Sequence, residues 1–176
     1  MKFHSEESVK ALEYAAGKEL ETEDYYRRLL NKVHHPGVIS VLKSMVEDEK
    51  KHYTIVMKLL KETSEGKTPS VEIIQSDAAK LRLERSFSQS ALSDPESFRE
   101  DASVRDILKK GLEIEKESFN NYSRASEESE DEELKAVYRF LAGEENKHYI
   151  LVDNLLSFID VPGRWLYNEE NLIFRR

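Results

Sequence analysis

The chain has 176 residues, 39% of them apolar and 35% charged, so it is long enough to bury a core and too apolar to be disordered. Its net charge of −8 argues against nucleic acid as a partner, and the lack of cysteine excludes disulfides, cysteine-ligated zinc, iron–sulfur clusters and thiol catalysis. Only 6 glycines and 4 prolines favour long helices over a fold with many strands and turns.

Four proline-free stretches repeat apolar residues at helical spacing and predict helices over residues 5–33, 37–63, 98–127 and 130–160. Pro36 and Gly37 predict a tight turn between the first two helices. Capping-box spacing, in Ser97 with Glu100 and in Ser129 with Glu132, marks the expected starts of the third and fourth helices.

The connections between these helices predict the topology. The first and third are short, whereas the middle one, about residues 65–101, could run the length of a bundle and could include a short helix from Asp77 to Phe87. Two hairpins joined by one long crossover form a ferritin-like, all-α four-helix bundle. We expect this bundle to span residues 1–160, and a tail over 161–176 to pack on it or on a partner subunit.

The two halves of the chain repeat each other at an offset of 96 residues without a gap. The offset pairs acidic, imidazole and aromatic residues as well as apolar ones. The pairs are Glu19 with Glu115, Tyr26 with Tyr122, Glu49 with Glu145, His52 with His148 and Tyr53 with Tyr149. The sequence therefore predicts two copies of one helical hairpin related by an approximate two-fold axis.

Six polar residues interrupt the apolar stripes of the four predicted helices. Glu49 precedes His52 by three residues, and Glu145 precedes His148 likewise, so each pair lies on one helix face. Buried carboxylates are costly unless they are paired or bind metal, and two divalent cations would neutralise four of them. The predicted metal ligands are Glu19, Glu49, His52, Glu115, Glu145 and His148.

Two tyrosines follow the single-glutamate ligands by two helical turns. Tyr26 and Tyr122 could hydrogen-bond the ligand carboxylates, or they could simply be core aromatics. Carboxylate and imidazole ligands suit iron, and they also accept manganese or zinc.

These motifs resemble the rubrerythrin branch of the ferritin-like superfamily. The resemblance rests on GKELETEDYY, EIEKESFNNY, EDEKKHY and GEENKHY, and more weakly on the tail VPGRWLYNEENL. It implies that the six residues are iron ligands, with Glu49 and Glu145 bridging. It also implies reduction of hydrogen peroxide at a diiron site, with electrons from a rubredoxin-type centre.

The sequence departs from the rubrerythrin pattern in two ways. A full rubrerythrin carries a rubredoxin domain built on four cysteines, and this chain has none, so its electron donor would be a separate protein. Rubrerythrins also place an extra carboxylate one turn after the third-helix glutamate, where this chain has Ser118. That substitution removes the side chain to which the family's redox-linked ligand exchange is attributed.

The sequence leaves three functions open. The leading hypothesis is an oxidoreductase that reduces hydrogen peroxide or O₂ in defence against oxidative stress. The alternatives are an iron-storage protein without peroxidase turnover and a metal-free interaction module. We expect a cytoplasmic homodimer that does not insert into membranes, because we find neither a signal peptide nor an apolar run of about 18–20 residues.

Overall fold

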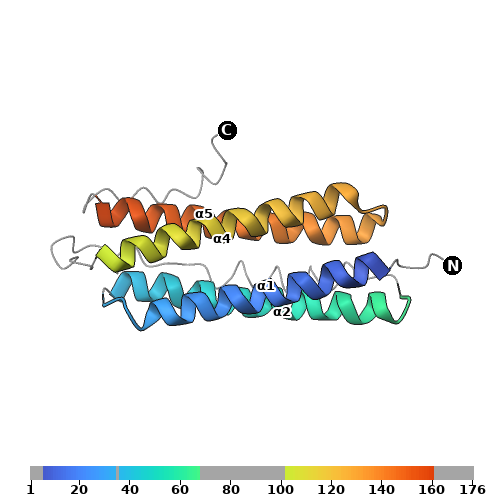
Figure 1. Ribbon diagram of the computed structural model, residues 1–176, viewed down its shortest axis with the longest axis horizontal. Coiled ribbons are helices and arrows are strands. Elements are labelled where there is room, and N and C mark those ends of the chain that lie inside the picture. The colour runs from blue at the N-terminus through green and yellow to red at the C-terminus, as the bar shows by residue number, and fades with distance from the viewer. Residues whose placement is uncertain (1–5, 35, 68–101, 161–176) are drawn as a thin grey trace.

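The protein is a bundle of four long helices and no strands within the part that its computed structural model describes, residues 6–34, 36–67 and 102–160 (Figure 1). These helices are α1 (Glu6–Leu30), α2 (Pro36–Ser64), α4 (Ala102–Glu128) and α5 (Glu132–Asp160). The predicted all-α four-helix bundle is therefore confirmed. The predicted crossover with its short helix, the cap at Ser97 and the C-terminal tail lie outside the described residues.

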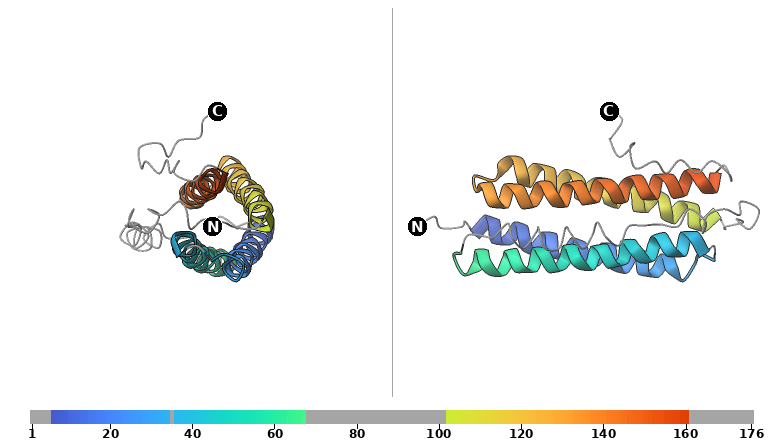
Figure 2. Two further views of the ribbon diagram at one scale, coloured as in Figure 1. Left: turned by 90° about the vertical axis from the view of Figure 1, so that its left-hand side faces the viewer. Right: turned by 180° about the vertical axis from the view of Figure 1, so that it is seen from behind.

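The helices pair as two antiparallel hairpins. α1 packs along α2, and α4 packs along α5, while α1 and α4 lie side by side and run in opposite directions (Figure 2). α2 ends and α4 begins at opposite ends of the bundle. This is the helix order expected for two hairpins related by an approximate two-fold axis.

Two helix starts differ from the prediction. Pro36 is the first residue of α2 rather than part of the turn, a position that suits proline because its fixed φ is helical and no amide hydrogen bond is lost there. At α5 the cap is Asp131 and not Ser129, since Asp131 Oδ1 accepts hydrogen bonds from the amides of Glu133 and Leu134 at 2.9 and 3.1 Å.

Two apolar clusters fill the bundle. One surrounds Tyr26 and Leu42 near the turn between α1 and α2, and the other surrounds Tyr122 and Leu59 near the turn between α4 and α5. The buried polar residues predicted as ligands come from helix segments between these clusters. No helix among the described residues has an apolar stretch long enough to cross a membrane.

Candidate metal centre

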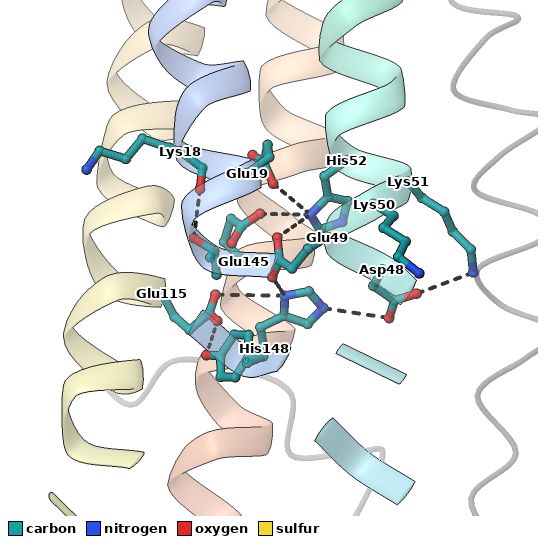
Figure 3. A network of polar contacts seen from close by, with 12 residues as sticks. Lys18, Glu19, Asp48, Glu49, Lys50, Lys51, His52, Glu115, Glu145 and His148 are labelled. Atoms are coloured by element: carbon teal, nitrogen blue, oxygen red, sulfur yellow. Dashed lines mark hydrogen bonds and ion pairs between the residues drawn. The ribbon is translucent and has the colours of Figure 1, made fainter. Parts of the chain in front are cut away.

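All four helices contribute to one buried polar cluster (Figure 3). Each member is at most 3% exposed. α1 supplies Glu19, α2 supplies Glu49 and His52, α4 supplies Glu115, and α5 supplies Glu145 and His148. The structure thus brings together the six residues whose spacing predicts metal ligation, although they come from segments up to 129 residues apart in the sequence.

Three carboxylates converge on one nitrogen of His52. Its Nδ1 lies 3.0 Å from Glu145 Oε1 and 3.4 Å from both Glu49 Oε2 and Glu19 Oε2. Because a metal ion would take the place of a proton at such a point of convergence, Nδ1 is the nitrogen of His52 that faces the ligand set.

His148 occupies the matching position in the other half. Its Nδ1 lies 2.8 Å from Glu49 Oε1 and 3.8 Å from Glu115 Oε2. The two imidazole rings stack with centroids 5.3 Å apart and planes at 28°. Glu49 therefore directs one carboxylate oxygen toward each imidazole. Within the group Glu49, His52, Glu145 and His148, one ligand atom from each residue lies within 4.8 Å of the others.

The pKa values of the clustered residues reflect the concentration of buried negative charge. Burial disfavours the imidazolium forms, yet the surrounding carboxylates outweigh burial and raise the pKa of His52 and of His148 well above the usual value. Burial also raises the pKa of Glu115, helped by the negative charge of Glu49. The concentration of buried negative charge therefore favours positive charge at the cluster, from bound protons or from cations.

The donor atoms of the cluster fit a pair of metal ions. Buried polar atoms in proteins nearly always have hydrogen-bond partners. Within the described part of the chain, eight side-chain atoms of this cluster are buried without a hydrogen bond of acceptable geometry. They are Glu49 Oε1 and Oε2, His52 Nδ1 and Nε2, Glu115 Oε2, Glu145 Oε1, and His148 Nδ1 and Nε2. Carboxylate oxygens and imidazole nitrogens are ligands of iron, manganese and zinc, so the residues present suit such ions.

The two predicted tyrosines reach across the bundle to the opposite hairpin. Tyr26 Oη of α1 donates a hydrogen bond to Glu115 of α4, and Tyr122 Oη of α4 donates one to Glu19 of α1. Burial raises the pKa of both phenols, and the neighbouring carboxylates raise it further, so both remain protonated donors. Each tyrosine fixes one oxygen of a predicted ligand and leaves the other directed into the cluster.

Asp48 and Glu144 are buried acidic residues that the sequence analysis missed. Asp48 Oδ2 lies 3.6 Å from His148 Nε2, the nitrogen facing away from the ligand carboxylates. Both residues are at most 5% exposed, and each pairs with a lysine three residues later. The internal repeat could have indicated both residues, because Asp48 and Glu144 correspond at the 96-residue offset, and so do their partners Lys51 and Lys147.

Ser118 lies one turn beyond Glu115 on α4. It is half-buried and forms part of the wall of a hollow between α1 and α4, beside Tyr122. The position where rubrerythrins carry an extra carboxylate therefore faces a space next to the cluster.

Comparison with known families agrees with this arrangement. Residues 10–156 match the family model described as rubrerythrin. The chain belongs to the rubrerythrin family. All six predicted ligands lie inside the matched segment of this rubrerythrin domain, and its buried carboxylate–imidazole group can bind a dinuclear metal centre. No curated protein and no solved structure matches the chain.

Proposed function

We propose that this rubrerythrin-family chain is a non-haem diiron oxidoreductase that reduces hydrogen peroxide or O₂ with electrons from a separate donor protein. The observation that carries the proposal is the convergence of four buried glutamates and two histidines, with eight of their donor atoms lacking hydrogen bonds. Four buried carboxylates this close together require positive charge beside them, which two divalent cations would supply.

The six residues divide into two matching sets. Glu19 and His52 would complete the ligands of one ion, and Glu115 and His148 those of the other, with Glu49 and Glu145 shared. Support for sharing comes from Glu49, whose Oε1 is 2.8 Å from His148 Nδ1 while its Oε2 is 3.4 Å from His52 Nδ1. A carboxylate that faces both imidazoles is suited to bridging.

When bound, two ferrous ions supply one electron each, which together with two protons converts hydrogen peroxide into two water molecules. The protein's own residues prepare the site for this reaction. Tyr26 and Tyr122 orient Glu115 and Glu19 by donating hydrogen bonds and retain their own protons. The apolar clusters on either side exclude bulk water, which strengthens the electrostatic interactions inside.

The electron donor in this proposal is a separate rubredoxin-type protein. The 176 residues contain no cysteine, so they provide no ligands for a rubredoxin-type iron centre. The homodimer stays a prediction from sequence, which light scattering would test.

The test is a stopped-flow experiment on protein loaded anaerobically with Fe²⁺. We expect about two irons per chain and oxidation of both by one equivalent of hydrogen peroxide, in keeping with the two ligand sets. Glu49→Gln should abolish stoichiometric iron binding, whereas Glu47→Gln, at an exposed position on the same helix, should not. Absence of any reaction with peroxide or O₂ would contradict the proposal, and accumulation of far more than two irons per chain would favour storage instead.

A further inference from the structure

A hollow of about 140 Å³ opens between α1 and α4 at the Tyr122 end of the metal centre. Its wall is largely apolar and aromatic, and Lys18 and Arg124 also line it. The other residues of the wall are Ala11, Tyr14, Ala15, Ser118, Asn121, Tyr122, Ala125, Glu128 and Tyr138. For comparison, a dry apolar protein cavity of roughly 150 Å³ accommodates benzene, so this hollow is large enough for a phenyl or tert-butyl group.

The side chain of Tyr122 connects the wall of the hollow with the candidate metal centre. Tyr122 forms part of the wall of the hollow, and its hydroxyl donates a hydrogen bond to Glu19. The other oxygen of Glu19 lies 3.4 Å from His52 Nδ1. Next to Tyr122, the wall includes Ser118, whose small side chain occupies the position one turn after Glu115. A molecule in the hollow would therefore lie against a residue that holds a predicted metal ligand.

The internal repeat shows how the two halves of the chain differ around this space. Ala11, Asn121 and Ala125 of the hollow correspond, at the 96-residue offset, to larger residues around Tyr26. The corresponding residues are Ile107, Tyr25 and Leu29.

These larger residues fill the matching space beside Tyr26. Tyr25 packs edge-on against Tyr26 with ring centroids 5.6 Å apart and donates a hydrogen bond to the carbonyl oxygen of Ile107. Leu29 is 1% exposed and belongs to the same apolar cluster. There is little room to spare, since a Cβ added at Gly111 would lie 3.3 Å from Tyr26 Oη. The two ends of the candidate centre thus have matching predicted ligands but differ in the size of several neighbouring residues.

We propose that the hollow receives the organic group of an alkyl or aryl hydroperoxide and so makes such hydroperoxides substrates of the metal centre. This inference rests on the proposed peroxidase function. In the reaction ROOH + 2e⁻ + 2H⁺ → ROH + H₂O, the O–O bond breaks, the two reduced ions are each oxidised by one electron, and the separate donor protein restores them. Hydrogen peroxide needs no such space, whereas a hydroperoxide with an apolar group does, and burial of that group against the apolar part of the wall would favour its binding.

The peroxide oxygens lie, in this proposal, between Ser118 and Tyr122. Serine at position 118 takes up less of the hollow than a longer carboxylate side chain would. The phenyl or alkyl group then rests against the aromatic wall formed by Tyr14 and Tyr122.

The test compares two oxidants on the iron-loaded, reduced protein. Cumene hydroperoxide and hydrogen peroxide are mixed with wild type and with Ala125→Leu, which installs the residue that the other repeat carries as Leu29. We expect the second-order rate constant for cumene hydroperoxide to fall about tenfold or more, because the phenyl group loses its space, and that for hydrogen peroxide to change less than about twofold. Asn120→Leu, which adds the same side chain to an exposed position of α4, should leave both rates unchanged.

The outcomes separate this inference from the proposed function. Reaction of wild type with hydrogen peroxide but not with cumene hydroperoxide would overturn the inference alone. So would an equal slowing of both oxidants by Ala125→Leu, or no slowing of either. If neither peroxide reacts with wild type, the proposed function and the inference both fail. Should Ala125→Leu not fold, Ala11→Ile fills the same space with the residue found at Ile107.

A binding measurement without metal provides an independent check. Cumyl alcohol, the reduced product, should shift the amide NMR signals of Ser118, Tyr122 and Ala125 in metal-free wild-type protein and in Asn120→Leu. These shifts should be lost in Ala125→Leu. The inference would be overturned if the shifted signals belonged to residues elsewhere on the protein. It would also be overturned if cumyl alcohol caused no shifts at concentrations at which cumene hydroperoxide saturates the reaction rate.

Discussion

Removal of metal should lower the melting temperature of this protein by a large and calculable amount. The perturbation is chelation of protein that has been loaded with a redox-inert ion such as Zn²⁺, which accepts carboxylate and imidazole ligands. In the proposed arrangement two matching ligand sets share Glu49 and Glu145, so two ions should contribute. The unfolded chain has no preformed site and should bind them much more weakly.

The magnitude follows from the number of ions and the length of the chain. At a free metal concentration 100-fold above the dissociation constant, each ion stabilises the fold by about 2.7 kcal/mol, so two contribute about 5.4 kcal/mol. For a chain of this size, each kcal/mol shifts the melting temperature by about 2–4 °C. We therefore expect chelation to lower the melting temperature by roughly 10–20 °C, measured by circular dichroism at 222 nm or by calorimetry.

A matched pair of variants on α4 makes the result specific to the cluster. Glu115→Gln removes a fully buried carboxylate whose pKa is raised by burial and by Glu49, so the metal-free form should melt no lower than wild type. In the same variant, metal should raise the melting temperature by at most about half as much as in wild type, because one ion loses a ligand. Glu117→Gln changes an exposed residue and should behave as wild type in both states. The reasoning is refuted if chelation leaves the melting temperature of wild type within about 2 °C, or if Glu115→Gln alters both states in the same direction.

Two further predictions concern the protons and the neighbours of the ligands. The pKa values of His52 and His148 are raised in the folded protein, so protonation of these histidines stabilises the metal-free fold. This stabilisation is complete below about pH 6.5 and is lost as the pH rises through the pKa values of the folded state. The loss is up to about 1.4 kcal/mol per pH unit for each histidine. Metal affinity rises over the same range as ligands deprotonate, so the gap in melting temperature between loaded and metal-free protein should widen from pH 6.5 to 8, and a constant gap would contradict this account. Separately, Asp48→Asn should weaken Zn²⁺ binding about 10- to 100-fold in calorimetric titration, because a neutral amide replaces the carboxylate 3.6 Å from His148 Nε2. Exposed Glu47→Gln is the control, and equal affinities in the two variants would show that Asp48 has no influence on its histidine.

Helical periodicity was sufficient to predict the four helices, because long amphipathic segments in this chain carry few competing signals. The three-residue spacing between Glu49 and His52 fixes their common face, and the 96-residue offset implies that Glu145 and His148 repeat it. Convergence of all six residues then follows from packing two equivalent hairpins. Exact helix ends were less predictable, since Ser129 and Asp131 are both good caps and only the three-dimensional structure shows that Asp131 accepts the amide hydrogen bonds.

Contacts that cross between hairpins could not be derived from periodicity. The spacing of Tyr26 along α1 relates it to Glu19, seven residues earlier, yet its hydroxyl reaches Glu115 on α4 instead. Such a pairing depends on the relative translation of the two hairpins, which no local pattern encodes. For the same reason the hollow beside Tyr122 was not apparent, because its walls come from α1, α4 and α5.

The repeat explains both what is alike and what differs at the two ends of this metal centre. The predicted ligand residues are identical in the two halves, so each ion would receive the same kinds of donor atom. The surrounding residues differ in size between the two halves. Leu29 in the first half corresponds to Ala125 in the second, a difference that alters side-chain volume but not charge. Tyr25 and Leu29 pack beside Tyr26 in one half, whereas Asn121 and Ala125 line the hollow beside Tyr122 in the other. Asymmetry around a symmetric ligand set is therefore where we expect substrate selection to reside, and Ala125→Leu against cumene hydroperoxide is its most direct test.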